Sequence, residues 1–137
     1  MLKKIAGALL ADLKIEKAEL GINLLAAREM SLLNETFLRH EGPTDVITFD
    51  YAKKRKSLHG EIFVCVHEAV VQAKSFRSNW QLETVRYVIH GVLHLLGHDD
   101  SRAAARRKMK REENRLLRGL SRRFSLADIA RATKLAA

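Results

Sequence analysis

The chain has 137 residues, a length that suits one domain with one hydrophobic core. Hydrophobic residues make up 47% of it, which excludes general disorder, and the single cysteine, Cys65, excludes an internal disulfide. The formal net charge of +9 favours a polyanionic partner such as nucleic acid. Asp12 interrupts the apolar stretch near the N-terminus, so we expect no signal peptide, no membrane span and a cytoplasmic location.

The first half of the chain mixes helical and strand patterns. Apolar residues at helical spacing predict helices over residues 1–14 and 26–39. Alternating or continuous apolar runs predict strands over residues 18–25, 45–51 and 60–66. The last of these strands is nearly all apolar, which is typical of a central strand. A basic run between two strands predicts a solvated hairpin loop at Lys53, Lys54, Arg55 and Lys56.

Only helical patterns follow residue 67. They predict helices over residues 67–76 and 80–96, and a long basic helix that ends near residue 120. Asn79 can cap the second of these helices, and Gly97 ends it. Ser125 and Asp128 have the spacing of a capping box and predict a short C-terminal helix. We expect Phe76 and Trp80 to pack in the core, although aromatic side chains can also stack on bases.

Strands that come early and helices that come late predict an α+β fold. We expect a small mixed sheet of three to four strands with packed helices, formed by residues 1–137 as one domain. The helix over residues 80–96 is expected to resemble the metal-binding helix of zincin-type metalloproteases, for the reason that follows.

Two histidines on that helix predict a metal site. His90 and His94 are separated by one helical turn, so both imidazoles can face one cation. Imidazole suits zinc and similar divalent metals, and we expect one such ion, with Zn²⁺ favoured. A ligand beyond Gly97 can complete a three-point site whose fourth position stays open for water, which is typical of catalytic zinc.

The third ligand has two candidates. Asp100 fits the His-x3-His-x2-Gly-x2-Asp spacing, which matches the layout of metzincin proteases. His98 is the competitor because imidazole is the commoner zinc ligand. Asp99 would then orient an imidazole or shape the turn. Metalloproteases with this helix carry a glutamate base after the first histidine, and Gly91 stands there instead, which argues against their mechanism.

The segment from His90 to Asp100 reads H-G-V-L-H-L-L-G-H-D-D and resembles the signature H-G-x-L-H-L-x-G-Y-D-H of the YbeY family. The run G-P-T-D-V-I-T-F at residues 42–49 and Gly60-Glu61-Ile62 resemble further stretches of that family. Gln72 and Glu83 fall where the family often has the same residue types. The likeness covers about residues 30–115.

Three positions depart from the family pattern. The final histidine of the signature is Asp100 here, and the tyrosine is His98. An arginine that matters for catalysis in the family falls on Leu38, with Arg39 one position later. We expect Arg39 to replace it, or activity to be weakened.

The resemblance implies a metal-dependent, single-strand-preferring endoribonuclease that acts in 16S rRNA 3′-end maturation and ribosome quality control. Its partners would be single-stranded RNA, rRNA and the ribosome, with no DNA or membrane expected. Arg39 is the expected catalytic residue, and residues 53–56 are the expected substrate-binding cations. Two alternatives stay open: a non-enzymatic RNA-associated or ribosome-associated factor with a structural metal, and a metal-dependent hydrolase of another substrate such as peptides.

Overall fold

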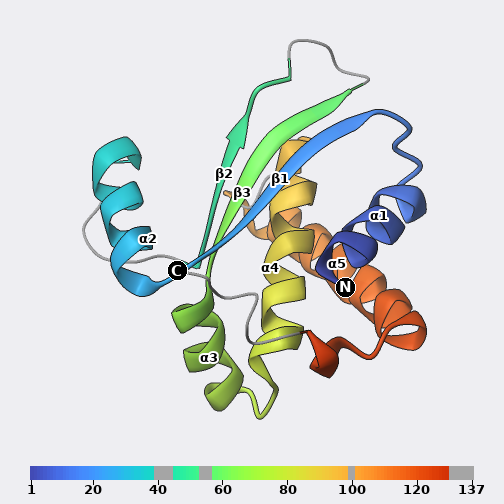
Figure 1. Cartoon of the computed structure of the whole chain (residues 1–137). Coiled ribbons are helices and arrows are strands. Elements are labelled where there is room, and N and C mark those ends of the chain that lie inside the picture. The colour runs from blue at the N-terminus through green and yellow to red at the C-terminus, as the bar shows by residue number, and fades with distance from the viewer. Residues whose placement is uncertain (39–44, 53–56, 99–100, 130–137) are drawn as a thin grey trace.

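A three-stranded mixed sheet carries the helices of this chain (Figure 1). The computed structural model describes residues 1–38, 45–52, 57–98 and 101–129. The strands are β1 (Ala18–Leu25), β2 (Val46–Asp50) and β3 (Leu58–Cys65). The helices are α1 (Leu2–Asp12), α2 (Ala27–Leu33), α3 (Val66–Ser75), α4 (Trp80–Leu95) and α5 (Ala103–Arg123). A π-helical turn at Asn34–Leu38 follows α2, and a 3₁₀ turn at Leu126–Asp128 follows α5.

The strand order is β1-β3-β2, with β3 parallel to β1 and antiparallel to β2. The apolar strand is therefore central, as its composition predicts, because both of its edges and most of its side chains are covered. The α+β class and the small mixed sheet are confirmed. The prediction of one domain over residues 1–137 stays a prediction.

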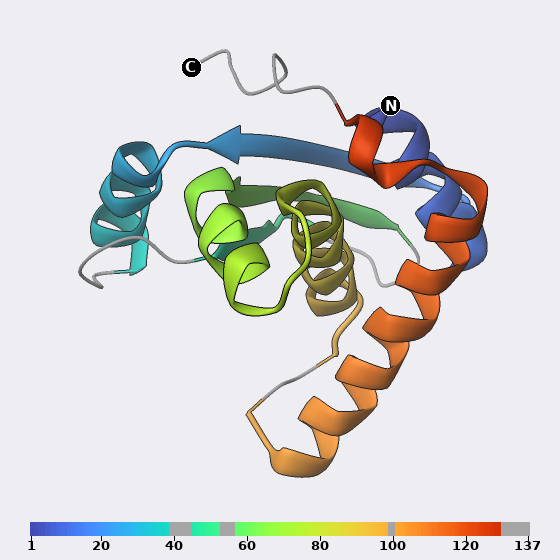
Figure 2. The same cartoon turned by 90° about the horizontal axis from the view of Figure 1, so that it is seen from below.

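Helix α4 lies against one face of the sheet and positions the candidate site. Figure 2 shows the sheet as one layer, with α3, α4 and α5 on the same side of it. Ile62 of β3 and Val88, Ile89 and Val92 of α4 are almost completely buried in the main core. Burial of such side chains supplies the main free-energy gain of folding and fixes the position of α4 on the sheet.

Gly91 lets α4 approach the sheet closely. A Cβ atom at this position would lie 2.9 Å from both Cδ1 and Cγ2 of Ile62, a distance below van der Waals contact. Ile62 is fully buried and has no room to move. Glycine is therefore required here by packing, which explains in structural terms why no glutamate occupies this position.

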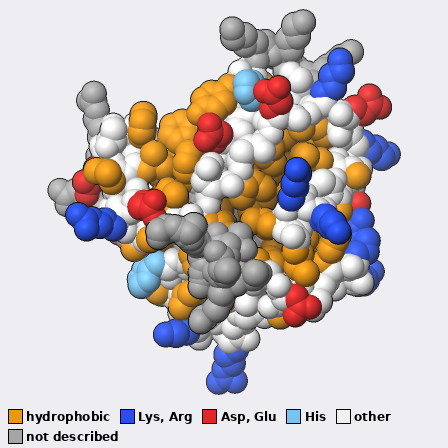
Figure 3. Space-filling model, viewed as in Figure 1, with side chains coloured by type: hydrophobic (Ala, Val, Ile, Leu, Met, Phe, Trp, Pro, Cys, Tyr) orange, Lys and Arg blue, Asp and Glu red, His pale blue; other side chains and the backbone are white. Residues whose placement is uncertain are grey.

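The opposite face of the sheet has a smaller core under α2. Met30, Ile47 and Cys65 are buried there, and the thiol of Cys65 has a pKa raised by burial. Beyond this core, hydrophobic side chains show on the surface of that face (Figure 3). Phe49 contacts both Phe37 and Phe63 edge to face on this side of the sheet.

The caps predicted at the two ends of α4 are confirmed, and the cap predicted at Ser125 is not. The side chain of Asn79 accepts a hydrogen bond from the Leu82 amide and caps α4. Gly97 has φ +97°, a left-handed conformation that favours glycine, and it ends the helix as predicted. The capping box at Ser125 is wrong, because its side chain makes no capping hydrogen bond and only a 3₁₀ turn follows it in the described residues.

Within the four described ranges, none of the helices combines the length and the apolar character that crossing a bilayer requires.

Candidate active site

Two imidazoles converge on the surface of α4. His90 and His94 lie one turn apart, and their Nε2 atoms are 3.1 Å from each other. Two nitrogen ligands at about 2.1 Å from a tetrahedral zinc ion lie about 3.4 Å apart, so this pair needs little adjustment to share one ion. The rings meet edge to face, with their centroids 4.6 Å apart. The arrangement fits a metal centre and confirms the convergence that the helical spacing predicts.

A carboxylate holds His90 from its other side. Oε2 of Glu113 lies 2.6 Å from Nδ1 of His90. The Glu113 side chain is 6% exposed, so this contact is largely withdrawn from solvent. A carboxylate at Nδ1 keeps the ring proton on that nitrogen and leaves the Nε2 lone pair to bind a metal. Metal-binding histidines commonly have such a partner.

The third ligand of the site is not found in the described part of the chain. Within it, no group of three or more histidine, cysteine or acidic side chains could hold a metal ion. His98 therefore does not complete a three-ligand site with His90 and His94 there. The competing candidate, Asp100, lies outside the described residues, so its assignment stays a prediction.

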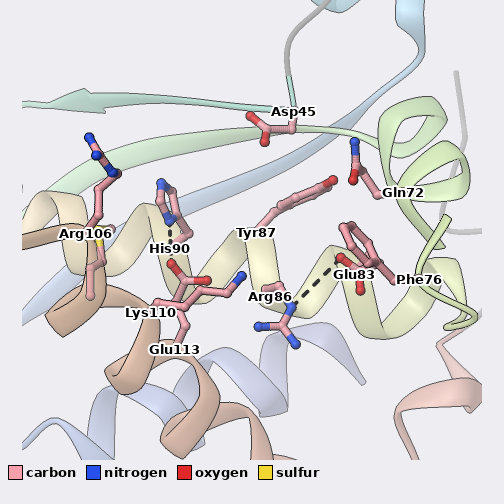
Figure 4. Close-up of a pocket in the computed structure, with 11 residues that line it drawn as sticks. Asp45, Gln72, Phe76, Glu83, Arg86, Tyr87, His90, Arg106, Lys110 and Glu113 are labelled. Carbon is pink, nitrogen blue, oxygen red and sulfur yellow. Dashed lines mark hydrogen bonds and ion pairs between the residues drawn. The ribbon is translucent and has the colours of Figure 1, made fainter. Parts of the chain in front are cut away.

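A cavity of about 400 Å³ begins at His90 and runs along α4 between α3 and α5 (Figure 4). It is bounded by Asp45, the residue before β2, and by residues of the three helices. The lining residues are Asp45, Gln72, Phe76, Glu83, Arg86, Tyr87, His90, Arg106, Met109, Lys110 and Glu113. Four of them lie in stretches that resemble the family, namely Asp45, Gln72, Glu83 and His90.

One face of α4 connects the histidine pair to the far end of the cavity. Glu83, Tyr87, His90 and His94 follow each other at helical spacing of four, three and four residues. Glu83 is buried and lies 3.9 Å from the Nε atom of Arg86. This spacing is the signal in the sequence that could have identified Tyr87 as a residue of the site.

Tyr87 brings a buried hydroxyl to the cavity wall. It is 7% exposed, and its hydroxyl has no hydrogen-bond partner among the described residues. Burial raises the pKa of this hydroxyl, and the negative charge of Asp45 raises it further, so the group stays protonated. Figure 4 shows the hydroxyl end of the ring pointing between Asp45 and Gln72.

The predicted catalytic and substrate-binding cations cannot be placed. Arg39 and the basic run Lys53, Lys54, Arg55 and Lys56 all lie outside the described residues. Their roles therefore stay predictions. Asp45 marks the nearest described position after Arg39, and it lies in the cavity wall. Its Oδ1 atom accepts a hydrogen bond from the Val46 amide at 2.8 Å, which is turn chemistry at the strand entry.

Phe76 after α3 and Trp80 at the start of α4 differ in exposure. Trp80 is 9% exposed and packs in the core, as predicted. The prediction that Phe76 packs in the core is wrong, because this side chain is 70% exposed. Phe76 follows the last turn of α3, where the chain leaves the helix. It forms a wall of the cavity instead.

A family model described as endoribonuclease YbeY matches residues 1–121 of this chain. An endoribonuclease YbeY from Chlorobium phaeovibrioides is 34% identical over 117 residues, which cover 85% of this chain and 78% of the relative. A second, from Elusimicrobium minutum, is 31% identical and is covered to 85%, as is this chain. The solution structure of TM1509 from Thermotoga maritima superposes with a TM-score of 0.69 at 25% identity, over 96% of this chain and 88% of that protein.

Proposed function

Because the chain belongs to the endoribonuclease YbeY family, we propose that it cuts single-stranded RNA at a metal centre formed by His90, His94 and Asp100. Family membership makes the chain a nuclease that acts on phosphodiester bonds of RNA. The proposal adds the substrate form, the ligand set and the metal, for which Zn²⁺ is the candidate that fits two imidazoles and a carboxylate.

The observation that supports this proposal is the geometry of the histidine pair. Their Nε2 atoms lie 3.1 Å apart, and His90 is held by Glu113 at its Nδ1 atom. Such a pair, with a third ligand from the segment after Gly97, leaves a fourth position for water or for a phosphate oxygen. A bound zinc ion would polarise that oxygen and lower the pKa of a bound water molecule to about 7.

The protein itself must hold the anionic strand and stabilise the charge that develops during cleavage. We propose that Arg39 stabilises the developing charge, since a fixed guanidinium suits a phosphoryl oxygen. The basic run at residues 53–56 is proposed to hold the RNA backbone. Exposed cations of α5, among them Arg106 and Lys110, add positive charge at the rim of the cavity.

The physiological substrate that we propose is the 3′ end of 16S rRNA, with a further role in ribosome quality control. The net charge of +9 supports a polyanionic partner of this kind. We propose a cytoplasmic location, where this rRNA and the ribosome are found.

The packing of Gly91 disfavours the alternative of a peptide hydrolase. A glutamate base in the zinc-protease position would have to place its Cβ 2.9 Å from Ile62. A peptidase mechanism would therefore need a base from elsewhere in the chain.

Cleavage of a labelled single-stranded RNA tests the proposed function. We expect wild-type protein to cut it with Zn²⁺, and we expect a chelator or His94→Ala to abolish cleavage. The matched control is His59→Ala, because His59 is 47% exposed and pairs with Glu19 away from the cavity. Cleavage that persists at the wild-type rate in His94→Ala would contradict the proposal.

A further inference from the structure

The cavity beside His90 has an aromatic wall at the end opposite to Arg106 and Lys110. Phe76 is 70% exposed, the largest exposed fraction among the large hydrophobic side chains of the described residues. Figure 4 shows Phe76 and Gln72 on the α3 side of the cavity, and Arg106 and Lys110 on the α5 side. Between them lie His90 and Tyr87 of α4 and Asp45, the residue before β2.

Charge is distributed unevenly across this cavity. Three acidic residues line it. Glu83 and Glu113 are buried, and each faces a cation or an imidazole. Asp45 is exposed immediately before β2, where its Oδ1 atom accepts a hydrogen bond from the Val46 amide. Arg106 and Lys110 are exposed, so the α5 rim presents positive charge to solvent. A nucleotide fits this arrangement, because its anionic phosphate can face the cationic rim while its flat, uncharged base faces the aromatic wall.

The distance from the histidine pair to the aromatic wall fits a nucleotide close to the one whose phosphate lies at the histidines. Glu83 and His90 are seven positions apart on α4, which corresponds to about 10 Å along the helix. Phe76 and Glu83 both line the cavity and are drawn at the same end of it in Figure 4. A base on Phe76 would thus belong to a nucleotide close to the phosphate at the histidine pair.

Two polar groups of the cavity wall can form hydrogen bonds with the edge of such a base. Gln72 offers an amide with both donor and acceptor atoms. Tyr87 adds a buried hydroxyl that lacks a partner among the described residues. An unpartnered buried hydroxyl is costly, and a polar ligand that reaches it would remove part of that cost.

We propose that this cavity is a nucleobase subsite, in which Phe76 stacks on one base of a single-stranded RNA next to the cleaved phosphate. The inference rests on the proposed function, because it takes the phosphate to lie at His90 and His94. Stacking on an exposed aromatic side chain tolerates all bases, since each base has a π face. The subsite therefore favours single strands over duplexes, in which bases are already stacked.

Binding to two strands of equal charge tests the subsite. The probes are oligouridylate of about eight nucleotides and an abasic strand of the same length. The full-length protein is kept in a chelator, so that neither strand is cut. Phe76→Ala should weaken binding of the intact strand by about fivefold or more, without changing binding of the abasic strand. Phe76→Trp should retain the wild-type preference for the intact strand.

Two control variants separate stacking from other effects. Lys110→Gln should weaken the binding of both strands equally, because it changes the charge of the cavity rim and not the stacking. Leu32→Ala removes another exposed apolar side chain, 65% exposed on α2, and should change neither affinity. Equal affinities of wild type and Phe76→Ala for the intact strand, or an equal loss on both strands, would overturn the subsite. Failure of wild-type protein to cut RNA with metal would instead overturn the proposed function.

Discussion

Glu113 of α5 and His90 of α4 are joined by a contact of 2.6 Å between Oε2 and Nδ1. The two residues are 23 positions apart in the chain, so only the packing of α5 against α4 brings them together. The core residues Met109 and Leu116 flank Glu113 on the buried face of α5. The ring of His90 is therefore oriented by the hydrophobic core before any metal binds.

Replacing Glu113 tests this orientation. Glu113→Gln keeps the shape of the side chain but removes its charge, so it holds the Nδ1 proton less strongly. We expect zinc affinity to fall by about 10- to 100-fold. Competition with a chromophoric chelator measures the change directly, without reference to cleavage.

The neighbouring glutamate is the matched control. Glu112 pairs with Arg115 on the surface, with contacts of 2.5 Å and 3.0 Å. The hydrogen bond from Arg115 lowers the pKa of the Glu112 carboxyl. Glu112→Gln should leave zinc affinity unchanged. Equal affinities of Glu113→Gln and wild type would show that Glu113 does not orient His90 for metal binding.

Periodicity was enough to predict most of the fold. The strand over residues 18–25 and the helix over residues 80–96 appear almost unchanged as β1 and α4, because apolar spacing and the caps at Asn79 and Gly97 agree. The expected helix over residues 26–39 instead splits into α2 and a π-helical turn. Periodicity does not distinguish these two conformations, since both continue the helical path.

The site was predictable only where its residues share one helix. His90 and His94 could be paired from spacing alone, whereas Glu113 looked like one of several charges on a basic helix. Its spacing of four from Met109 places it on the buried face, and that signal was available. The exposure of Phe76 depends on what packs beside α3, and the sequence near it contains no information about that.

Two glycine-to-alanine substitutions should change stability in opposite directions. Gly91→Ala forces a Cβ to within 2.9 Å of Ile62, and overpacking of this kind costs about 1–3 kcal/mol. The higher helix propensity of alanine recovers only about 1 kcal/mol, so the free energy of unfolding should fall. Gly119→Ala in α5 has its nearest such neighbour at 3.9 Å and should raise it by about 0.5–1 kcal/mol. Urea unfolding measures both, and a stabilised Gly91→Ala would refute the close approach of α4.

Removal of the Tyr87 hydroxyl should not destabilise the protein. The group is buried without a partner among the described residues, so Tyr87→Phe relieves a desolvation cost. We expect the free energy of unfolding to stay equal or to rise by up to about 1 kcal/mol. Thermal unfolding gives the comparison. A loss of more than about 1 kcal/mol would mean that the hydroxyl makes a stabilising hydrogen bond.

The basic run at residues 53–56 should affect the salt dependence of RNA binding. If Lys53 and Lys54 each contact a phosphate, the double substitution Lys53→Gln and Lys54→Gln removes two contacts. The slope of log K against log salt should then become shallower by about 1.4 for single-stranded RNA. Lys3→Gln with Lys4→Gln in the exposed part of α1 removes the same charge and should leave the slope unchanged. Equal slopes in both double variants would show that the run does not bind the backbone.

The choice of the third metal ligand can be decided by metal content. His90→Ala, His94→Ala and Asp100→Ala should each reduce bound zinc from one ion per chain to a small fraction, because a site with two protein ligands binds weakly. His98→Ala should retain the metal, since His98 joins no three-ligand group in the described residues. Elemental analysis after desalting provides the ratio of metal to protein for each variant. Full retention of zinc by Asp100→Ala, with loss in His98→Ala, would reverse the assignment and place an imidazole in the third position.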